Sequence, residues 1–248
     1  MASTSIWLTL GRRCWGRPAA LEERRGGIDE KGQLYIPATA YYDLNFGISP
    51  GDRPQNLEAT FIWQPPFGAG KRFAQSGVSS KVLGGWQLSG ILTSVSNFPV
   101  DMTASGTSLD MPGNTQRPNR LCSSIITPKN VGYGQDWFDP SCFGGVDTVG
   151  FGNSAFYIFH GPHQVNLDAA LFRNFKLTER FNLQFRAQAF NFTNTPAFSN
   201  PSGSCGSATS STDQICNSSS FGQVRGTGNF GRPTGDSRLF EFSARLSF

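Results

Sequence analysis

The end of the chain, residues 238–248, decides the fold; it reads RLFEFSARLSF. In a β-strand, alternate side chains point to opposite faces. One face of this stretch carries Phe240, Phe242, Ala244, Leu246 and Phe248, and the other carries Leu239, Glu241, Ser243, Arg245 and Ser247. An apolar face opposite a polar face is typical of a strand with lipid outside and water inside. The last strand of a soluble β-sandwich also alternates, so that alternative stays open here.

The composition fits a β-rich membrane or secreted protein. The chain has 248 residues, enough for one large β domain or two small ones, and charged residues make up only 15% of it, against about 25% in typical soluble domains. No apolar run is long enough for a membrane-spanning helix. The N-terminus does not read as a secretory signal, because residues 6–10 are too short a core and Arg12 and Arg13 follow them.

Six segments read as strands: 33–46, 56–64, 86–102, 163–175, 181–192 and 238–248. The clearest alternation is in 181–190, where Arg186 would be costly against lipid but is suited to a wet lumen. From this alternation and that of 238–248 we predict one lipid-facing set: Leu183, Phe185, Ala187, Phe240, Phe242, Ala244, Leu246 and Phe248.

The connections between these segments alternate in length. Those at 47–56 and 174–180 are short, the one at 65–85 is medium, and those at 103–162 and 193–237 are long. Outer-membrane barrels have short periplasmic turns and long outer loops. We therefore predict an all-β fold: an antiparallel up-and-down meander of about six strands, an incomplete segment of a large outer-membrane β-barrel with long outer loops. Residues 1–32 show no clear period and are assigned as an irregular N-terminal segment, with the barrel portion at 33–248.

The cysteines suggest an oxidising compartment. Cys122 and Cys142 bracket one polar, Gly- and Ser-rich stretch, and Cys205 and Cys216 bracket another, so two local disulfides are expected. Four buried or free thiols are the alternative, and Cys14 has no partner in this scheme.

Three features of the sequence could in principle bind a nucleotide or a metal ion, and each has a plainer interpretation. Residues 226–231 match G-x-G-x-x-G, but Pro233 follows where a nucleotide site needs a helix. Residues 68–71 lack the spacing of a P-loop. His160 and His163 have no neighbouring ligand in sequence, so no metal site is predicted.

Two groups in the first long loop keep a second interpretation. The loop aspartates could act as paired catalytic carboxylates, but we favour the interpretation that they are solvated loop charges. The loop aromatics could contact a ligand, but we favour the interpretation that they pack on the barrel rim. The groups are Asp136, Asp139 and Asp147, and Trp137, Phe138 and Phe143. No catalytic residue, cofactor or metal is proposed, and an enzyme is not expected.

An ordered set of short motifs resembles a known family. The set is GGWQLSGI at 84–91, RPNR at 117–120, WFDPSCF at 137–143, NLD at 166–168, FKLTERF at 175–181, LQFRA at 183–187, FN at 190–191 and RLSF at 245–248. Together these are similar to the C-terminal part of Oar-like TonB-dependent receptors, from about Ala40 to the end.

The resemblance implies part of a plugged barrel of about 22 strands, energised by the inner-membrane TonB complex. The plug and the TonB box of such receptors are not in this sequence, so we expect a barrel fragment of the outer membrane with a wet inner face and outer loops that contact an unknown substrate. Expected partners are outer-membrane lipid, the barrel-assembly machinery acting on the C-terminal strand, and the plug and other strands of the receptor. Nucleic acid is not expected, since no basic stripe with interleaved aromatics occurs. The alternative is a secreted β-rich binding module, such as an adhesin or a carbohydrate-binding domain.

Overall fold

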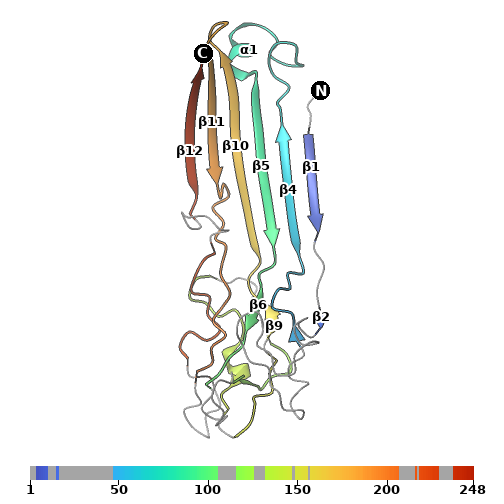
Figure 1. Cartoon of the computed structure of the whole chain (residues 1–248), viewed down its shortest axis with the longest axis vertical. Helices are drawn as coiled ribbons and strands as arrows, with labels where there is room; N and C mark the ends of the chain where they lie inside the picture. The colour runs from blue at the N-terminus through green and yellow to red at the C-terminus, as the bar shows by residue number, and fades with distance from the viewer. Residues whose placement is uncertain are drawn as a thin grey trace.

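A computed structural model gives the fold (Figure 1). It describes the backbone of 4–10 and 15–16, and in full residues 47–105, 116–125, 132–146, 149–155, 157–206, 216, 218–228 and 237–248. The main body is an antiparallel sheet in the order β1-β4-β5-β10-β11-β12. Its strands are β1 (Thr4–Leu10), β4 (Asn56–Trp63), β5 (Trp86–Val95), β10 (Gln164–Lys176), β11 (Asn182–Phe190) and β12 (Leu239–Ser247).

The sheet is an open meander. Consecutive long strands lie side by side, and β1 and β12 form the two edges. The 177–181 turn joins β10 to β11 at the upper end in Figure 1, where helix α1 (Gly77–Leu83) also lies. The long loops gather at the lower end. The predicted all-β antiparallel fold with long loops at one end is therefore confirmed, with α1 the small helical exception.

Smaller elements occur within the loops. They are β2 (Trp15–Gly16) with β3 (Gly47–Ile48), β6 (Pro99–Asp101) with β9 (Tyr157–His160), β7 (Asn119–Arg120) with β8 (Phe143–Gly144), and a 3-10 helix at Pro140–Cys142. The predicted strand 86–102 is thus two strands, because the chain leaves the main sheet after Val95 and pairs again within the loops.

The N-terminal assignment was wrong in one respect. Residues 1–32 were predicted to be irregular, but Thr4–Leu10 forms β1 and pairs with β4 from Thr4↔Trp63 to Leu10↔Leu57. The predicted edge strand at 33–46 lies outside the described residues, and the observed edge partner of β4 is β1. Ile6, Leu8 and Leu10 recur every second residue, as in the other strands, so the sequence does carry a strand signal at this position.

The register sorts the side chains onto two faces. Residues directly opposite each other in an antiparallel pair point to the same side. The apolar face of β4 to β12 comprises Leu57, Ala59, Phe61, Trp63, Trp86, Leu88, Gly90, Leu92, Ser94, Val165, Leu167, Ala169, Leu171, Arg173, Phe175, Leu183, Phe185, Ala187, Ala189, Phe240, Phe242, Ala244 and Leu246. The polar face is rich in amides, hydroxyls and charges, among them Glu58, Thr60, Gln87, Ser89, Asn166, Asp168, Asn174, Gln184, Arg186, Gln188, Glu241, Ser243 and Arg245.

Candidate functional site: a two-faced wall and a disulfide-bonded loop domain

The apolar face lies open along β12. Phe242 is 71% exposed and Phe240 51% exposed, although they sit in the middle of a regular strand. The register brings the β12 residues of the predicted lipid-facing set opposite those of β11, for example Phe242 opposite Ala187 and Leu246 opposite Leu183. Exposed contiguous apolar surface of this kind is typical of a face that contacts lipid or another protein.

The height of the apolar face matches a membrane. On β10 it runs from Val165 to Phe175. Ten residue steps at about 3.4 Å give about 34 Å along the strand, which at a tilt of about 40° spans about 26 Å of membrane thickness. The lipid-facing band of outer-membrane barrels is about 25 Å tall.

Arg173 is the charged exception on the apolar face. Its side chain is 7% exposed and donates hydrogen bonds to the backbone oxygens of Val82 and Lys81 at the end of α1. Its guanidinium also lies 4.2 Å from the centroid of Phe175 and 5.2 Å from that of Trp86. Carbonyl acceptors and aromatic rings are what a cation needs when water is excluded.

Arg173 was not among the predicted site residues. Val165, Leu167, Ala169 and Leu171 occupy alternate positions of the predicted strand 163–175, and Arg173 is the next member of that alternation. Following the period of two by one more step places it there.

The polar face carries a small hollow at the α1 end. Its volume is about 200 Å³, and it is bordered by the amides of Gln64, Gln87 and Asn174, by Lys71, and by aromatic rings. Gln64 and Gln87 are hydrogen-bonded side chain to side chain at 3.4 Å. A wall with this lining is compatible with water or with a polar filling on the inside.

At the other end, the two long loops share one hydrophobic core. Its buried members are Val100, Met102, Phe138, Cys142, Phe143, Cys205 and Phe221. Phe138 is fully buried and its ring lies 4.9–5.4 Å, centroid to centroid, from those of Phe143, Phe159 and Phe221. These loop aromatics therefore fill a core of their own, which neither the rim-packing nor the ligand-contact interpretation anticipated. We call this unit, formed by the described parts of 96–162 and 191–228, the loop domain.

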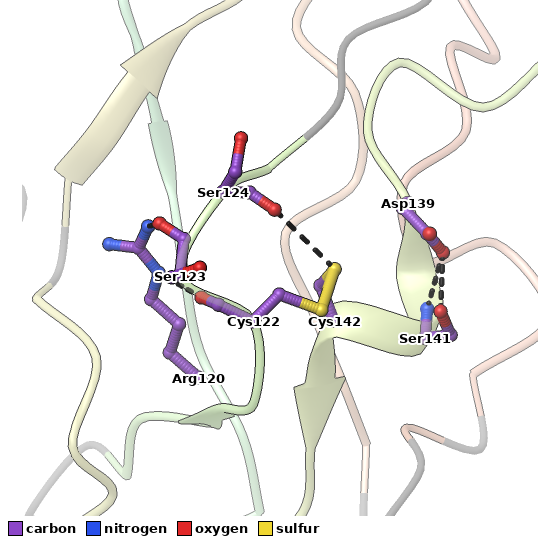
Figure 2. The surroundings of a disulfide bond; sticks show 7 residues. All are labelled: Arg120, Cys122, Ser123, Ser124, Asp139, Ser141 and Cys142. Atoms are coloured by element: carbon purple, nitrogen blue, oxygen red, sulfur yellow. Dashed lines mark hydrogen bonds between the residues drawn. A yellow bond between two sulfur atoms is a disulfide. The ribbon is translucent and has the colours of Figure 1, made fainter.

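Both predicted disulfides are present in the loop domain. Cys122 is bonded to Cys142, and Cys205 to Cys216, with sequence separations of 20 and 11 residues. Figure 2 shows the first of these, with Arg120 donating to the backbone oxygens of Cys122 and Ser123. Cross-links of this kind limit the freedom of the unfolded loops and so stabilise the folded ones.

Backbone pairing joins the first long loop to the second. Thr103 donates to the oxygen of Gly203 at 3.0 Å and accepts from the amide of Cys205 at 2.8 Å. A Cβ at Gly203 would lie 1.7 Å from the backbone oxygen of Asp101, so only glycine allows this approach. Further pairing links Gln135 with Val224 and Trp137 with Gly222. The two long loops thus form one packed unit.

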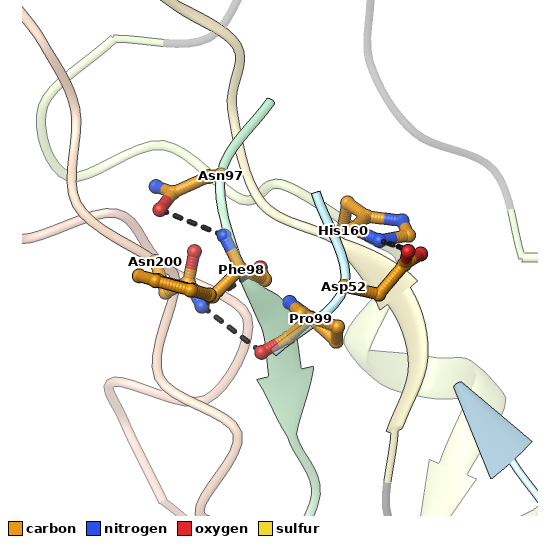
Figure 3. A network of polar contacts seen from close by, with 6 residues as sticks. All are labelled: Asp52, Asn97, Phe98, Pro99, His160 and Asn200. Carbon is orange, nitrogen blue, oxygen red and sulfur yellow. Dashed lines mark hydrogen bonds and ion pairs between the residues drawn. The ribbon is translucent and has the colours of Figure 1, made fainter. Parts of the chain in front are cut away.

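A polar network lies where the chain passes between the sheet and the loop domain (Figure 3). His160 on β9 lies 3.0 Å from the carboxylate of Asp52, which is 2% exposed. Asn200 donates to the backbone oxygens of Phe98 and Pro99, where the chain leaves β5 for β6. His163 is hydrogen-bonded to Ser94 at 2.8 Å. Both histidines therefore have structural partners at the junction.

The remaining motifs show no reactive arrangement among the residues described. Asp139 accepts from the amide and hydroxyl of Ser141 and so caps the 3-10 helix (Figure 2). Asp136 forms a backbone bridge with Gln223, and Asp147 and the end of the 226–231 motif lie outside the described residues. In the part of the chain that the structure describes, no group of three or more His, Cys, Asp or Glu side chains is placed to hold a metal ion.

One charge is buried within the loop domain. Arg117 is fully buried, and this burial lowers its pKa to about 9, because removal from water disfavours the charged guanidinium. A pKa of about 9 still leaves the side chain charged at neutral pH. The arginine at the start of the predicted RPNR motif is therefore an interior residue of the loop domain.

Comparison with known proteins gives the family. Residues 20–237 match the family model described as outer membrane beta barrel domain. The chain belongs to this family. Its place is accordingly the outer membrane, in agreement with the two-faced sheet. No curated protein and no solved structure matches the chain. Within the described residues, no helix combines the length and the apolarity needed to cross a bilayer.

Proposed function

We propose that the chain forms part of the wall of an Oar-like TonB-dependent receptor and that its loop domain contacts the transported substrate outside the cell. The observation that carries the proposal is the geometry of the sheet: an apolar face continuous across β4 to β12, a polar face behind it, and long loops at one end only. Lipid outside, water inside and long outer loops are the features of outer-membrane barrels.

The receptor assignment within the family draws on the ordered motifs. Several lie where a wall segment would need them: FKLTERF spans the tight turn between β10 and β11, and RLSF ends the last strand. WFDPSCF supplies Phe138, Cys142 and Phe143 to the core of the loop domain. The motifs that carry the resemblance thus belong to the turn, the terminal strand and the loop core.

In this proposal the chain has no catalytic role. The sheet provides the wall, its apolar face contacts lipid, and its C-terminal strand is the segment recognised by the barrel-assembly machinery. The plug and further strands of the receptor would complete the lumen. The loop domain, held by two disulfides and a shared core, would offer the substrate a preformed surface and so lower the entropic cost of binding.

The secreted binding module is less well supported. That alternative needs the apolar face to be buried between two sheets. Phe242 and Phe240 are instead exposed, and the other sheets among the described residues have two short strands each and lie in the loops.

The proposal that the sheet is a barrel wall predicts that its two ends lie on opposite sides of the outer membrane. Tyr133 is 72% exposed in the loop domain and Leu177 is 57% exposed in the turn at the opposite end of the sheet. We would introduce Tyr133→Cys and Leu177→Cys, each with Cys14→Ser, into the native gene of the native organism, so that the chain is made in its own polypeptide, and add a membrane-impermeant maleimide to the cells. Residue 133 should react in intact cells, and residue 177 only after the outer membrane is permeabilised. Equal labelling of both in intact cells would contradict the assignment.

The receptor assignment needs a separate test. An antiserum raised against residues 132–146 would be used on outer membranes of the native organism. A receptor carries its plug and other strands on the same polypeptide, so the band should be far larger than the 27.0 kDa of this chain and should crosslink to TonB. A band of about this chain's own mass, without crosslinking, would leave the barrel wall but refute the receptor.

A further inference from the structure

Helix α1 places an apolar surface at the end of the wall opposite the loop domain. Val78 and Val82 are four residues apart and so lie on one side of the helix. Val78 is 77% exposed, Val82 56% and Leu83 48%, and none of the residues of α1 is buried. The helix thus leaves its apolar side chains open to the surroundings.

The helix is held on the apolar side of the sheet. Arg173 and Trp86 are cross-strand partners on the apolar face, and both donate to the backbone oxygen of Val82, the indole at 3.0 Å. Arg173 also donates to the oxygen of Lys81. The end of α1 therefore lies over the rim of the face that the proposed function assigns to lipid.

The loop before α1 packs closely against the residue that follows the helix, and this contact fixes the position of the helix end. A Cβ on Gly68 would lie 2.8 Å from the Cα of Gly84, and Gly68 has a φ of +111°. Only glycine suits both the backbone conformation and the contact. The connection from β4 to β5 is therefore folded back on itself at the point where the helix ends.

This end of the sheet is basic. Residues 64–86 contain Lys71, Arg72 and Lys81 and no acidic residue. Residues 173–182 contain Arg173, Lys176 and Arg180 and one acidic residue, Glu179. Exposed aromatic side chains lie at the same end: Trp63 is 39% exposed, Phe73 50% and Phe181 43%. Basic residues beside aromatic and aliphatic ones are the composition of a surface that lies in a membrane interface.

We propose that α1 is an interfacial helix that binds the phospholipid surface of the periplasmic leaflet, with Val78, Val82 and Leu83 among the upper acyl carbons and Lys81 and Arg72 at anionic headgroups. This inference rests on the proposed function, because the helix continues the lipid-facing wall. Arg173 is the positioning residue: it holds the helix end against the wall and places the helix at the boundary of the apolar band.

Depth measurements test the proposal. In a Cys14→Ser background, the four disulfide cysteines stay oxidised, and single cysteines at Val78, Phe242 and Tyr133 would each carry an environment-sensitive fluorophore. The protein, with these cysteines introduced in the native organism and purified from its outer membrane, would be placed in phospholipid nanodiscs containing nitroxide lipids, labelled either on the headgroup or deep in the acyl chain. Residue 242 should be quenched most by the deep nitroxide, residue 78 most by the headgroup nitroxide, and residue 133 by neither.

The charge requirement is tested in the same discs with and without phosphatidylglycerol. Each of Lys81→Gln and Arg72→Gln should lower the ratio of inserted to free helix by about fivefold in the anionic discs, and neither should matter in neutral discs. Quenching at residue 242 without quenching at residue 78 would overturn the helix proposal and leave the wall intact. Loss of quenching at residue 242 would overturn both. If quenching at residue 78 is the same with and without phosphatidylglycerol, and is unchanged by Lys81→Gln and Arg72→Gln, the role of anionic lipid is overturned.

Discussion

The two faces of the wall predict a position-dependent cost for a new arginine. Ala187 lies on the apolar face, opposite Leu171 and Phe242, while its neighbour Gln188 lies on the polar face. Replacing alanine removes almost no packing, so Ala187→Arg isolates the cost of placing a charge against lipid. Gln188→Arg is the matched control on the same strand.

The expected free-energy cost of each new arginine depends on its depth in the membrane. β11 begins at Asn182, so Ala187 is five residues from the strand start. Five steps of about 3.4 Å at a tilt of about 40° place it about 13 Å into a band about 25 Å tall, which is near the midplane. An arginine there should cost about 2–4 kcal/mol, whereas Leu183→Arg, near the interface, should cost about 0–1 kcal/mol. Gln188→Arg should cost little.

The measurement is guanidinium unfolding of the protein, purified from the outer membrane of the native organism and placed in phospholipid nanodiscs, followed by tryptophan fluorescence. The unfolding midpoints of the three variants are compared at constant slope, since a changed slope would mean a changed native or unfolded state. Equal decreases in the free energy of unfolding for Ala187→Arg and Gln188→Arg would refute the two-faced wall. Equal losses for Leu183→Arg and Ala187→Arg would refute the depth assignment.

Four further outcomes are expected. Reduction of the disulfides should destabilise the loop domain by about 3 kcal/mol per bond, seen as faster proteolysis of the loops in reducing buffer; unchanged cleavage would contradict this. Phe138→Ala should cost about 3–5 kcal/mol in thermal unfolding of the loop domain, while the exposed Tyr133→Ala should cost almost nothing; similar effects would reject the shared core. Arg173→Gln should free the end of α1, so that trypsin cuts after Lys81 sooner than in the unaltered chain. Because β1 and β12 leave two open edges that lipid cannot satisfy, the 248-residue chain alone should form no channel in planar bilayers and should aggregate without detergent; a soluble, cooperatively folded chain would favour the binding module instead.

Local patterns in the sequence were enough to predict most of the sheet. Alternation has a period of two residues, so five of the six predicted segments contain strands at nearly the expected positions, and the β11 and β12 residues of the predicted set share one face. The disulfide pairings were also accessible, because each joins cysteines that are close in sequence. The exception was β1, where Ile6, Leu8 and Leu10 also recur every second residue but were not interpreted as a strand.

The tertiary structure alone decided what depends on residues far apart in the chain. Arg173 is acceptable on an apolar face only because α1, 91 residues earlier, supplies carbonyl acceptors, and His160 finds its carboxylate 108 residues away at Asp52. The loop domain is similar: each long loop alone reads as Gly- and Ser-rich connection with scattered aromatics, and only their pairing brings Phe138 and Phe221 into one core. A periodic pattern is a property of neighbouring residues and can be read locally, whereas a shared core or a compensated charge exists only once distant segments have met.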